Sequence, residues 1–193
     1  TYLSLLEKFE VCFILEDQNE NENGNEKKLI IPNLLPDPDM IKETKNNNLS
    51  LLKELEEKEN LTSSRTEKEK IINKREMIQK ENQRIISMEY EMSSIRNKLE
   101  KKWPPTIPLN TIEIERIFSF NQVPSEMVSR LLVRFHDKIV DNIIWRRGVL
   151  LKHFDDENIL CLLEVKMEEN LFEIRIRGKE RKECLEMMKY IYE

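Results

Sequence analysis

A seven-residue spacing of apolar side chains constrains the middle of this chain more than any other feature. The spaced residues are Ile71, Ile78, Ile85, Met92 and Leu99, and Met88 and Ile95 fill the complementary heptad position twice. This pattern predicts a helix over residues 66–102 with a coiled-coil seam at 71–99. At 1.5 Å per residue such a helix is roughly 55 Å long, too long to lie inside a compact domain of this size. It should project from the domain or pair with another helix.

The zone around this seam is highly charged but balanced in sign. Residues 37–102 carry 15 basic and 14 acidic side chains, with a run of three asparagines at 46–48. A zone this polar cannot form a core, and its balanced charge argues against a nucleic-acid-binding tail, which needs a net positive field. It is either a solvated helix or a disordered insertion.

Three arrangements of residues 38–102 are compatible with this pattern. The seam packs within the chain against the leucine-rich stretch Leu49, Leu51, Leu52 and Leu55, or it pairs with another molecule as a coiled coil, or the segment is a largely disordered loop. Trp103, Pro104, Pro105 and Pro108 then end any helix.

The flanking sequence has the patterns of ordinary folded protein. Alternation predicts strands at 9–15, 28–31, 112–120 (with a bulge or bend near Arg116), 142–152, 158–167 and 170–177, and apolar stripes predict helices from Ser125 and over 179–192. In the first of these helices Glu126 and Arg130 are spaced to form an ion pair. The predicted fold class is α+β: an antiparallel sheet of about six strands with packed helices, plus a long charged helical or disordered insertion.

Composition restricts the cellular setting. Cys12, Cys161 and Cys184 are far apart in apolar patterns, which predicts buried free thiols and not a disulfide framework or a zinc site. No stretch approaches eighteen apolar residues, and the N-terminus lacks the features of a signal peptide. We therefore expect a cytoplasmic protein without a transmembrane segment, and because the chain starts at Thr1, a piece of a longer one.

Residues suited to catalysis are few. His136 and His153 each lack a second ligand at metal-binding spacing, and the sequence contains no phosphate-binding glycine loop and no nucleophile motif. Glu113 and Glu115 share a strand face, which a solvated face explains. We expect no enzyme in this segment and no catalytic, cofactor-binding or metal-binding residues.

Arginine gives a stronger signal. Six arginines, Arg130, Arg134, Arg146, Arg147, Arg175 and Arg177, fall on elements expected to be neighbours, with Trp145 beside two of them. Arginine next to an aromatic residue is typical of protein interfaces and nucleic-acid grooves. Residues 103–193 carry 14 basic and 16 acidic groups, so a protein interface or internal salt bridges are favoured over nucleic acid. Glu164 or Glu173 are expected to pair with Arg175 and Arg177.

Four motifs together resemble a known family. KFEVCFIL at 8–15, LIIPNLLPD at 29–37, ERIFSFNQVPSEMVSRLLVRFHD at 115–137 and WRRGVLL at 145–151 are similar in order and spacing to the COR region of Roco proteins. COR follows the Ras-like GTPase (Roc) domain in that family, which includes the leucine-rich-repeat kinases. The resemblance covers residues 1–37 and 103–193, and the charged zone has no counterpart.

The resemblance implies an organisation and a function. Residues 1–8 would end the helical first half of COR, residues 9–37 and 103–193 would form its second half, and 38–102 would be an insertion. Such a module is not catalytic: it forms homodimers and couples the nucleotide state of its own Roc domain to an output domain such as a kinase. GTP or GDP and Mg²⁺ would bind the Roc domain, and this segment would hold no cofactor.

The resemblance also suggests interface residues. The segment matching Ile144, Trp145 and Arg146 faces the GTPase in the family, so these residues and the adjacent Arg147 are expected at that contact. Arg130 and Arg134 match positions on a helix, where they serve either an interface or internal pairing. The rival reading is a coiled-coil oligomerisation protein that works through residues 71–99.

Overall fold

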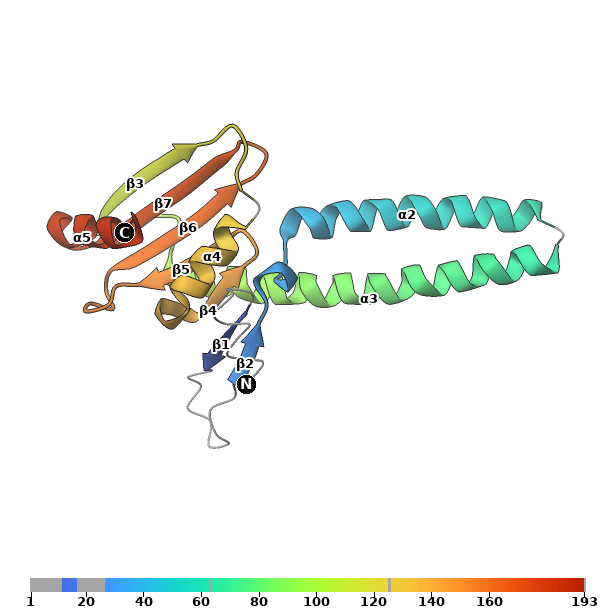
Figure 1. Ribbon diagram of the computed structural model, residues 1–193, viewed down its shortest axis with the longest axis horizontal. Helices are drawn as coiled ribbons and strands as arrows, with labels where there is room; N and C mark the ends of the chain where they lie inside the picture. Colours follow the sequence, from blue (N-terminus) through green and yellow to red (C-terminus); the bar gives the residue numbers. More distant parts are fainter. Residues whose placement is uncertain (1–11, 17–26, 63, 125, 193) are drawn as a thin grey trace. The chain divides into compact units, whose positions relative to one another are not determined.

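The computed structural model describes residues 12–16, 27–62, 64–124 and 126–192 (Figure 1). These residues form two units, one containing the chain up to Leu35 together with Ile95 onward, and the other containing Pro36–Ser94. The first unit is built on strands and short helices, and the second is a helical hairpin. The predicted α+β class, with a long charged helical segment, is confirmed.

An antiparallel five-stranded sheet organises the first unit. Its strands are β3 (Ile112–Ser119), β4 (Ile139–Trp145), β5 (Gly148–Lys152), β6 (Leu160–Lys166) and β7 (Leu171–Gly178). Their spatial order is β3-β7-β6-β5-β4, so β4 to β7 form a meander and β3 pairs with the last strand. A separate two-stranded ribbon pairs β1 (Phe13–Glu16) with β2 (Lys27–Ile30). The expected sheet of about six strands is thus divided into five strands and a ribbon.

Two details predicted from the sequence are wrong. The single strand expected over 142–152 is two strands, β4 and β5, joined by a tight turn at residues 146–147. The bulge expected near Arg116 is absent, because β3 pairs with β7 without a shift of register. The irregularity lies instead in β4 between Ile139 and Ile144, where Asp141 and Asn142 adopt left-handed φ angles of 48° and 56°.

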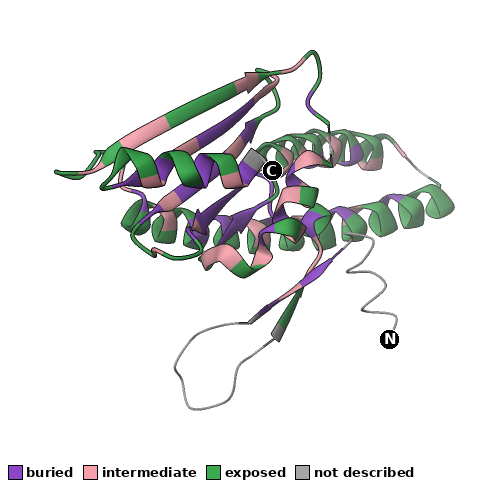
Figure 2. Ribbon diagram, turned by 60° about the vertical axis from the view of Figure 1, so that its left-hand side comes forward, coloured by how far each residue is buried: buried purple, intermediate pink, exposed green. Residues whose placement is uncertain are grey.

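One face of the sheet, which we call the first face, packs against helices. Helix α4 (Met127–Arg134) contributes Val128 and Leu132, and α5 (Arg181–Tyr192) contributes Cys184 and Met187. Side chains of the same strand face meet them, for example Ile174 and Ile176 of β7. Figure 2 shows that much of the ribbon of the central strands is buried. The period of two along each strand selects these residues, and the period of 3.6 along each helix provides the complementary stripe.

The β1–β2 ribbon joins the same core although the helical hairpin separates it from the sheet in sequence. Phe13 is 1% exposed and lies in the core cluster with Leu15, and its ring is 5.6 Å from that of His136. A 3-10 turn after the ribbon, η1 (Pro32–Leu34), contacts α4, with Ser129 Oγ donating to Asn33 Oδ1 at 3.3 Å. The predicted strand residues 9–11, the predicted COR residues 1–8 and Ser125, the predicted start of a helix, lie outside the described residues.

The second unit is an antiparallel pairing of α2 (Pro38–Leu61) with the part of α3 (Arg65–Lys102) that ends at Ser94. Asp37 begins α2, its Oδ1 accepting hydrogen bonds from Asp39 N at 3.1 Å and Met40 N at 3.4 Å. Cross-helix contacts keep one antiparallel register: Arg75 with Glu59 at 2.5 Å near the turn, and Lys45 with Glu89 at 2.8 Å further along. Of the three arrangements left open by the sequence, the structure has the intramolecular hairpin.

The predicted seam lies inside this hairpin. Ile71 and Ile78 form a buried cluster with Leu55, against which Leu51 and Leu52 pack. Ile85, Met92 and Ile95 are also buried, whereas Met88 and Leu99 are half-buried. The seam residues are therefore already covered within the chain.

A buried amide pair interrupts this apolar packing. Asn48 is 3% exposed, and its Nδ2 donates to Asn82 Oδ1 at 2.9 Å. Replacing Asn48 with Ala leaves the Asn82 amide without its partner, so we expect a loss of about 1–2 kcal/mol in unfolding free energy. The double variant Asn48→Leu/Asn82→Leu should be at least as stable as the native chain.

Chemical denaturation followed by circular dichroism measures both variants. A single Asn48→Ala variant as stable as the native chain would show that the amide pair contributes nothing. A loss of the sharp transition in the double-leucine variant would show that the pair fixes the register of the hairpin.

Candidate functional site

The turn between β4 and β5 is the centre of the predicted interface. Trp145 and Gly148 are partners across the hairpin, and Trp145 is only 6% exposed. The indole lies over Gly148 so closely that a Cβ there would be 2.3 Å from the ring atom Cζ2 and 2.7 Å from the Leu163 carbonyl oxygen. Val165 N donates to Arg147 O at 2.8 Å, which ties the turn to β6. Glycine is required here by the close approach of the indole.

The four residues predicted to face the GTPase do not share one environment. Ile144 is 3% exposed and points into the core of the first face, and Trp145 is buried on the opposite face, which we call the second face. Arg146 is exposed at the tip of the hairpin and Arg147 is half-buried. Only the two arginines of the turn are presented at the surface, and Trp145 holds the turn that presents them.

The second face carries a row of charged pairs between adjacent strands. Glu164 of β6 pairs with Arg175 of β7, as the sequence predicted. Glu173, the other expected partner, pairs instead with Lys166 at 2.5 Å, an interaction that raises the pKa of the lysine. Arg177 pairs with Glu113 of β3 at 2.5 Å. The local pattern around Glu113 predicts a solvated face and not this contact, because the identity of the strand beside β7 is not a local property.

Residues at the end of α3 lie on this second face. The guanidinium of Arg177 is 4.1 Å from the centre of the Trp103 ring, and its Nη1 donates to Pro104 O at 2.6 Å. Lys102 Nζ is 3.1 Å from Asp141 Oδ2, and Lys98 Nζ donates to Asp141 O at 3.2 Å. The prolines that end α3 therefore also place the ring of Trp103 and the carbonyl of Pro104 over the buried Arg177.

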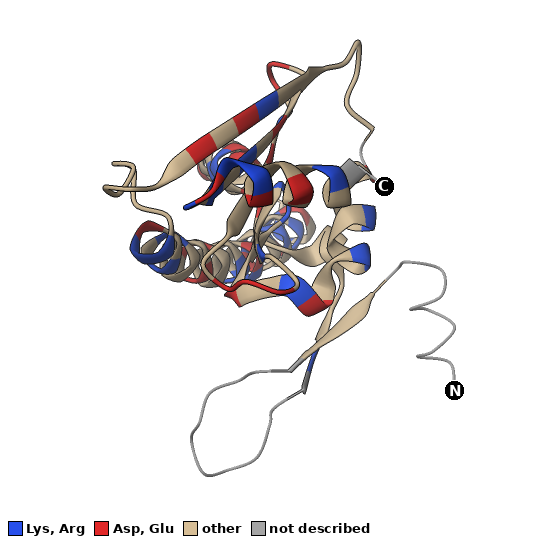
Figure 3. Cartoon of the chain, turned by 90° about the vertical axis from the view of Figure 1, so that its left-hand side faces the viewer, with Lys and Arg blue, Asp and Glu red and all other residues tan. Residues whose placement is uncertain are grey.

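Arginines of α4 are separate from those of β7. Arg130 is exposed and its Nη2 is 3.4 Å from Glu126 Oε2, the predicted pair. The guanidinium of Arg134 lies 5.2 Å from the centre of the Phe135 ring. Since α4 packs on the first face and Arg175 and Arg177 lie on the second, the six arginines do not form one patch. Figure 3 shows basic and acidic residues interspersed over the elements, including the charged bands of β3.

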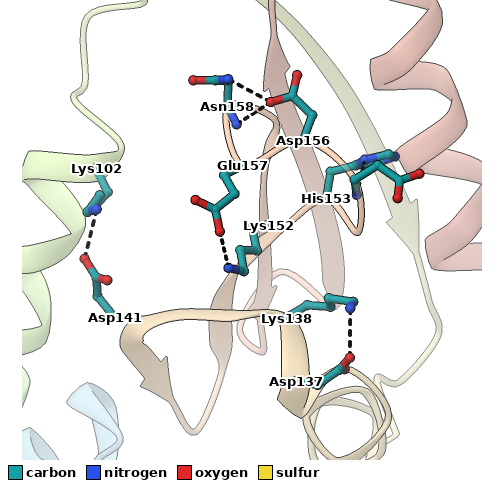
Figure 4. A network of polar contacts seen from close by, with 10 residues as sticks. Lys102, Asp137, Lys138, Asp141, Lys152, His153, Asp156, Glu157 and Asn158 are labelled. Carbon is teal, nitrogen blue, oxygen red and sulfur yellow. Dashed lines mark hydrogen bonds and ion pairs between the residues drawn. The ribbon is translucent and has the colours of Figure 1, made fainter. Parts of the chain in front are cut away.

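Polar contacts stabilise the strand ends near the β4 irregularity (Figure 4). Asp156 accepts from Asn158 N and Nδ2, both at 2.8 Å, which lowers the pKa of the Asp156 carboxyl. Glu157 accepts from Lys152 Nζ at 2.6 Å, which lowers the pKa of Glu157. Lys138 bonds to Asp137 at 2.9 Å, which raises the pKa of the lysine. These partners close turns within the chain, so the network has a structural explanation.

The three cysteines and His153 are buried, and His136 is half-buried. His136 Nδ1 is 2.8 Å from Val133 O, and His153 Nδ1 accepts from Asp155 N at 3.2 Å. All three cysteines are free and buried, as predicted, and burial raises the thiol pKa of Cys161 and of Cys184. Within residues 12–16, 27–62, 64–124 and 126–192, no group of three His, Cys, Asp or Glu side chains could hold a metal ion. None of the described helices has the length and apolarity to cross a membrane.

An antiparallel sheet with helices on one face and the end of a helix over the other is the architecture of an α+β module. Residues 111–191, from β3 into α5, match the family model for the COR-B domain, described as C-terminal of Roc. These residues are therefore similar to a COR-B domain, and over this part of the chain the resemblance to the COR region of Roco proteins is confirmed. No curated protein matches the chain.

The pairing of Glu113 with Arg177 can be tested against a neighbour on the same strand face. Replacing Glu113 with Ala leaves the largely buried Arg177 without its carboxylate, so we expect a loss of about 2–3 kcal/mol in unfolding free energy. The exposed Glu115 serves as the matched control, and Glu115→Ala should change stability by less than about 0.5 kcal/mol. Urea denaturation of both variants measures the difference, and equal effects would contradict the assigned role.

The close approach at Gly148 gives a second prediction. Replacing Gly148 with Ala forces the new methyl group against the Trp145 ring and the Leu163 carbonyl, so we expect a loss of about 1–3 kcal/mol. The double variant Gly148→Ala/Trp145→Ala removes the clash with the ring, and the two effects should be less than additive. Thermal unfolding checks this, and strictly additive losses would show that the indole and the glycine are not coupled.

Proposed function

We propose that this chain is a non-catalytic COR module of a cytoplasmic Roco protein, which binds its own Roc GTPase domain, forms homodimers and couples the nucleotide state of Roc to an output domain such as a kinase. The COR-B match over the five-stranded sheet carries this proposal, because the description of that family places it C-terminal of Roc. GTP or GDP and Mg²⁺ belong to the Roc domain, and this segment needs no cofactor of its own.

The contact with Roc is made by the β4–β5 hairpin. Arg146 is exposed at its tip, and the turn is fixed by the indole of Trp145 over Gly148 and by the bond from Val165 N to Arg147 O. A guanidinium on a rigid turn loses little conformational freedom on binding and can form bidentate hydrogen bonds with carboxylates. Trp145 acts in this contact by holding the turn, since it is buried in the chain.

The same hairpin supports a relay. Lys98 and Lys102 of α3 bind Asp141 of its strand β4, and its strand β5 is hydrogen-bonded to β6, so a displacement of the tip is resisted by the whole sheet. A rigid module of this kind passes on a change in Roc only if it binds the two nucleotide states with different affinity. Differential affinity is therefore the quantity that the proposed coupling requires.

The rival function, a coiled coil through residues 71–99, conflicts with the use of that seam inside the hairpin. Ile71 and Ile78 already pack against Leu55, so intermolecular pairing through them must first break these contacts. Binding of nucleic acid by Arg175 and Arg177 is equally disfavoured, because both guanidiniums are paired with carboxylates.

Arginine at the hairpin tip provides the direct test. We expect Arg146→Ala to weaken binding of the protein's Roc domain by about 1–2 kcal/mol, roughly tenfold, through loss of a charged interface contact. Arg130→Ala removes an exposed arginine of α4 and is the matched control, expected to bind as the native chain does. Calorimetric titration of each folded variant with Roc gives the affinities. Loss of binding in the α4 variant alone would move the contact to α4 and overturn the hairpin assignment.

Nucleotide dependence is measured with the same titration. The proposal expects Roc loaded with GDP and Roc loaded with a non-hydrolysable GTP analogue to bind this chain with different affinities, by about fivefold or more. Equal affinities for the two states would rule out coupling through this contact.

A further inference from the structure

Helix α3 carries a second heptad stripe on the face opposite the seam. Its members alternate in steps of four and three residues: Gln79, Gln83, Ile86, Tyr90, Ser93 and Asn97. All six are exposed, with Ile86 at 62% and Tyr90 at 79%. Steps of four and three keep side chains on one face of a helix, as in the seam of a coiled coil.

This stripe is unusual because it is uncharged within a charged helix. Between residues 79 and 97 the charged side chains of α3, such as Lys80, Glu81, Arg84, Glu89, Glu91 and Arg96, all lie off the stripe. A solvated helix face needs no such segregation, and two large apolar side chains four residues apart at its centre cost free energy when left in water. A face of this kind is explained by a partner helix.

The pattern of charge around the stripe selects a second copy in antiparallel orientation. In a parallel pairing of two copies, Glu69 and Glu76, which extend the stripe toward its N-terminal end, would face themselves. Aligned antiparallel about Ile86, the two isoleucines meet, Gln83 lies within one residue of the level of Tyr90 of the other copy, and Glu76 lies within one residue of the level of Asn97. No like charges on the stripe are then opposed. A contact in which the same patch serves both copies closes a two-fold dimer.

We propose that two copies of this chain associate through the α3 stripe, antiparallel and centred on Ile86. The inference rests on the dimerisation part of the proposed function and names its surface, which lies outside the residues matched by COR-B. The seam at 71–99 holds the hairpin together, and the stripe on the other face of the same helix holds the dimer. Because its centre has few apolar residues, the contact is weak and depends on concentration.

Molar mass in solution tests whether the stripe, and not another surface of the chain, forms the dimer contact. Light scattering over a concentration series is run on the native chain, on Ile86→Glu, on Tyr90→Glu and on the matched control Met77→Glu, which replaces a 72% exposed residue of α3 outside the stripe. The native chain and the Met77 variant should dimerise with the same dissociation constant, and each stripe variant should weaken it at least tenfold. Circular dichroism confirms that all four remain helical.

Orientation is tested with single cysteines placed on the stripe. Gln79 of one copy lies level with Ser93 of the other in the antiparallel pairing, within one residue of register. A disulfide should therefore form only when chains carrying Gln79→Cys are mixed with chains carrying Ser93→Cys, and not in either variant alone. The native cysteines are buried and do not compete. Crosslinking of each variant with itself would overturn the antiparallel pairing.

The outcomes distinguish this inference from the proposed function. A native dimer that persists unchanged in both stripe variants overturns the stripe and leaves COR dimerisation to another surface. A native chain that stays monomeric at every concentration overturns both the stripe and the dimerisation, while the binding of Roc by the β4–β5 hairpin is decided independently by its own titration.

Discussion

Burial of both faces of one sheet is the constraint on which the first unit depends. The first face has helices α4 and α5, but Leu150 and Leu162 on the second face are 0% and 2% exposed, so this face is also excluded from water. Arg177 lies on the same face and could not be buried there alone, because an unpaired charge in such a setting is costly. Glu113, Trp103 and the carbonyl of Pro104 surround it and make its burial tolerable.

That constraint explains why the end of α3 belongs with the sheet. The charged segment looks like an insertion in the sequence, yet residues from Ile95 on form part of the first unit. Lys98 and Lys102 reach the left-handed residue Asp141, whose carbonyl and carboxylate both serve as acceptors. The irregularity in β4 therefore has a local function: it turns polar groups of an edge strand toward the helix and interrupts an edge that could otherwise pair with another strand.

Sequence patterns predicted what depends on local periodicity. The positions of most strands, the apolar stripe of α4, the pairing of Glu126 with Arg130 and the buried thiols all follow from the side chains of one element. The division of 142–152 into two strands was missed because the turn at Arg146 and Arg147 lacks the usual turn residues and its only glycine, Gly148, lies inside β5. The predicted bulge at Arg116 failed for a related reason. An exposed edge strand need not alternate strictly, and Ile117 is 49% exposed there.

Which of the candidate interface residues are exposed could be predicted only in part, because exposure depends on tertiary packing. Arginine beside tryptophan predicted an interface contact at Trp145. The indole instead packs on Gly148 within the chain, and the two arginines of the turn remain at the surface. Glu113 shows the converse. Nothing in its neighbourhood along β3 distinguishes it from Glu115, and only the pairing of β3 with β7 places it beside Arg177.

The heptad pattern predicts that α3 buries one face, but it does not determine which helix covers that face. Apolar residues seven apart specify that a helix will bury one face, but a helix of the same chain and a helix of another chain offer equivalent packing. The choice is made by effective concentration: α2 ends at Leu61 and α3 begins at Arg65, so the short link between them makes the intramolecular partner available at far higher concentration than any second molecule. The seam at 71–99 is therefore taken by α2. Any association between copies through α3 must use side chains that α2 cannot reach, such as Ile86 and Tyr90 on its outer face.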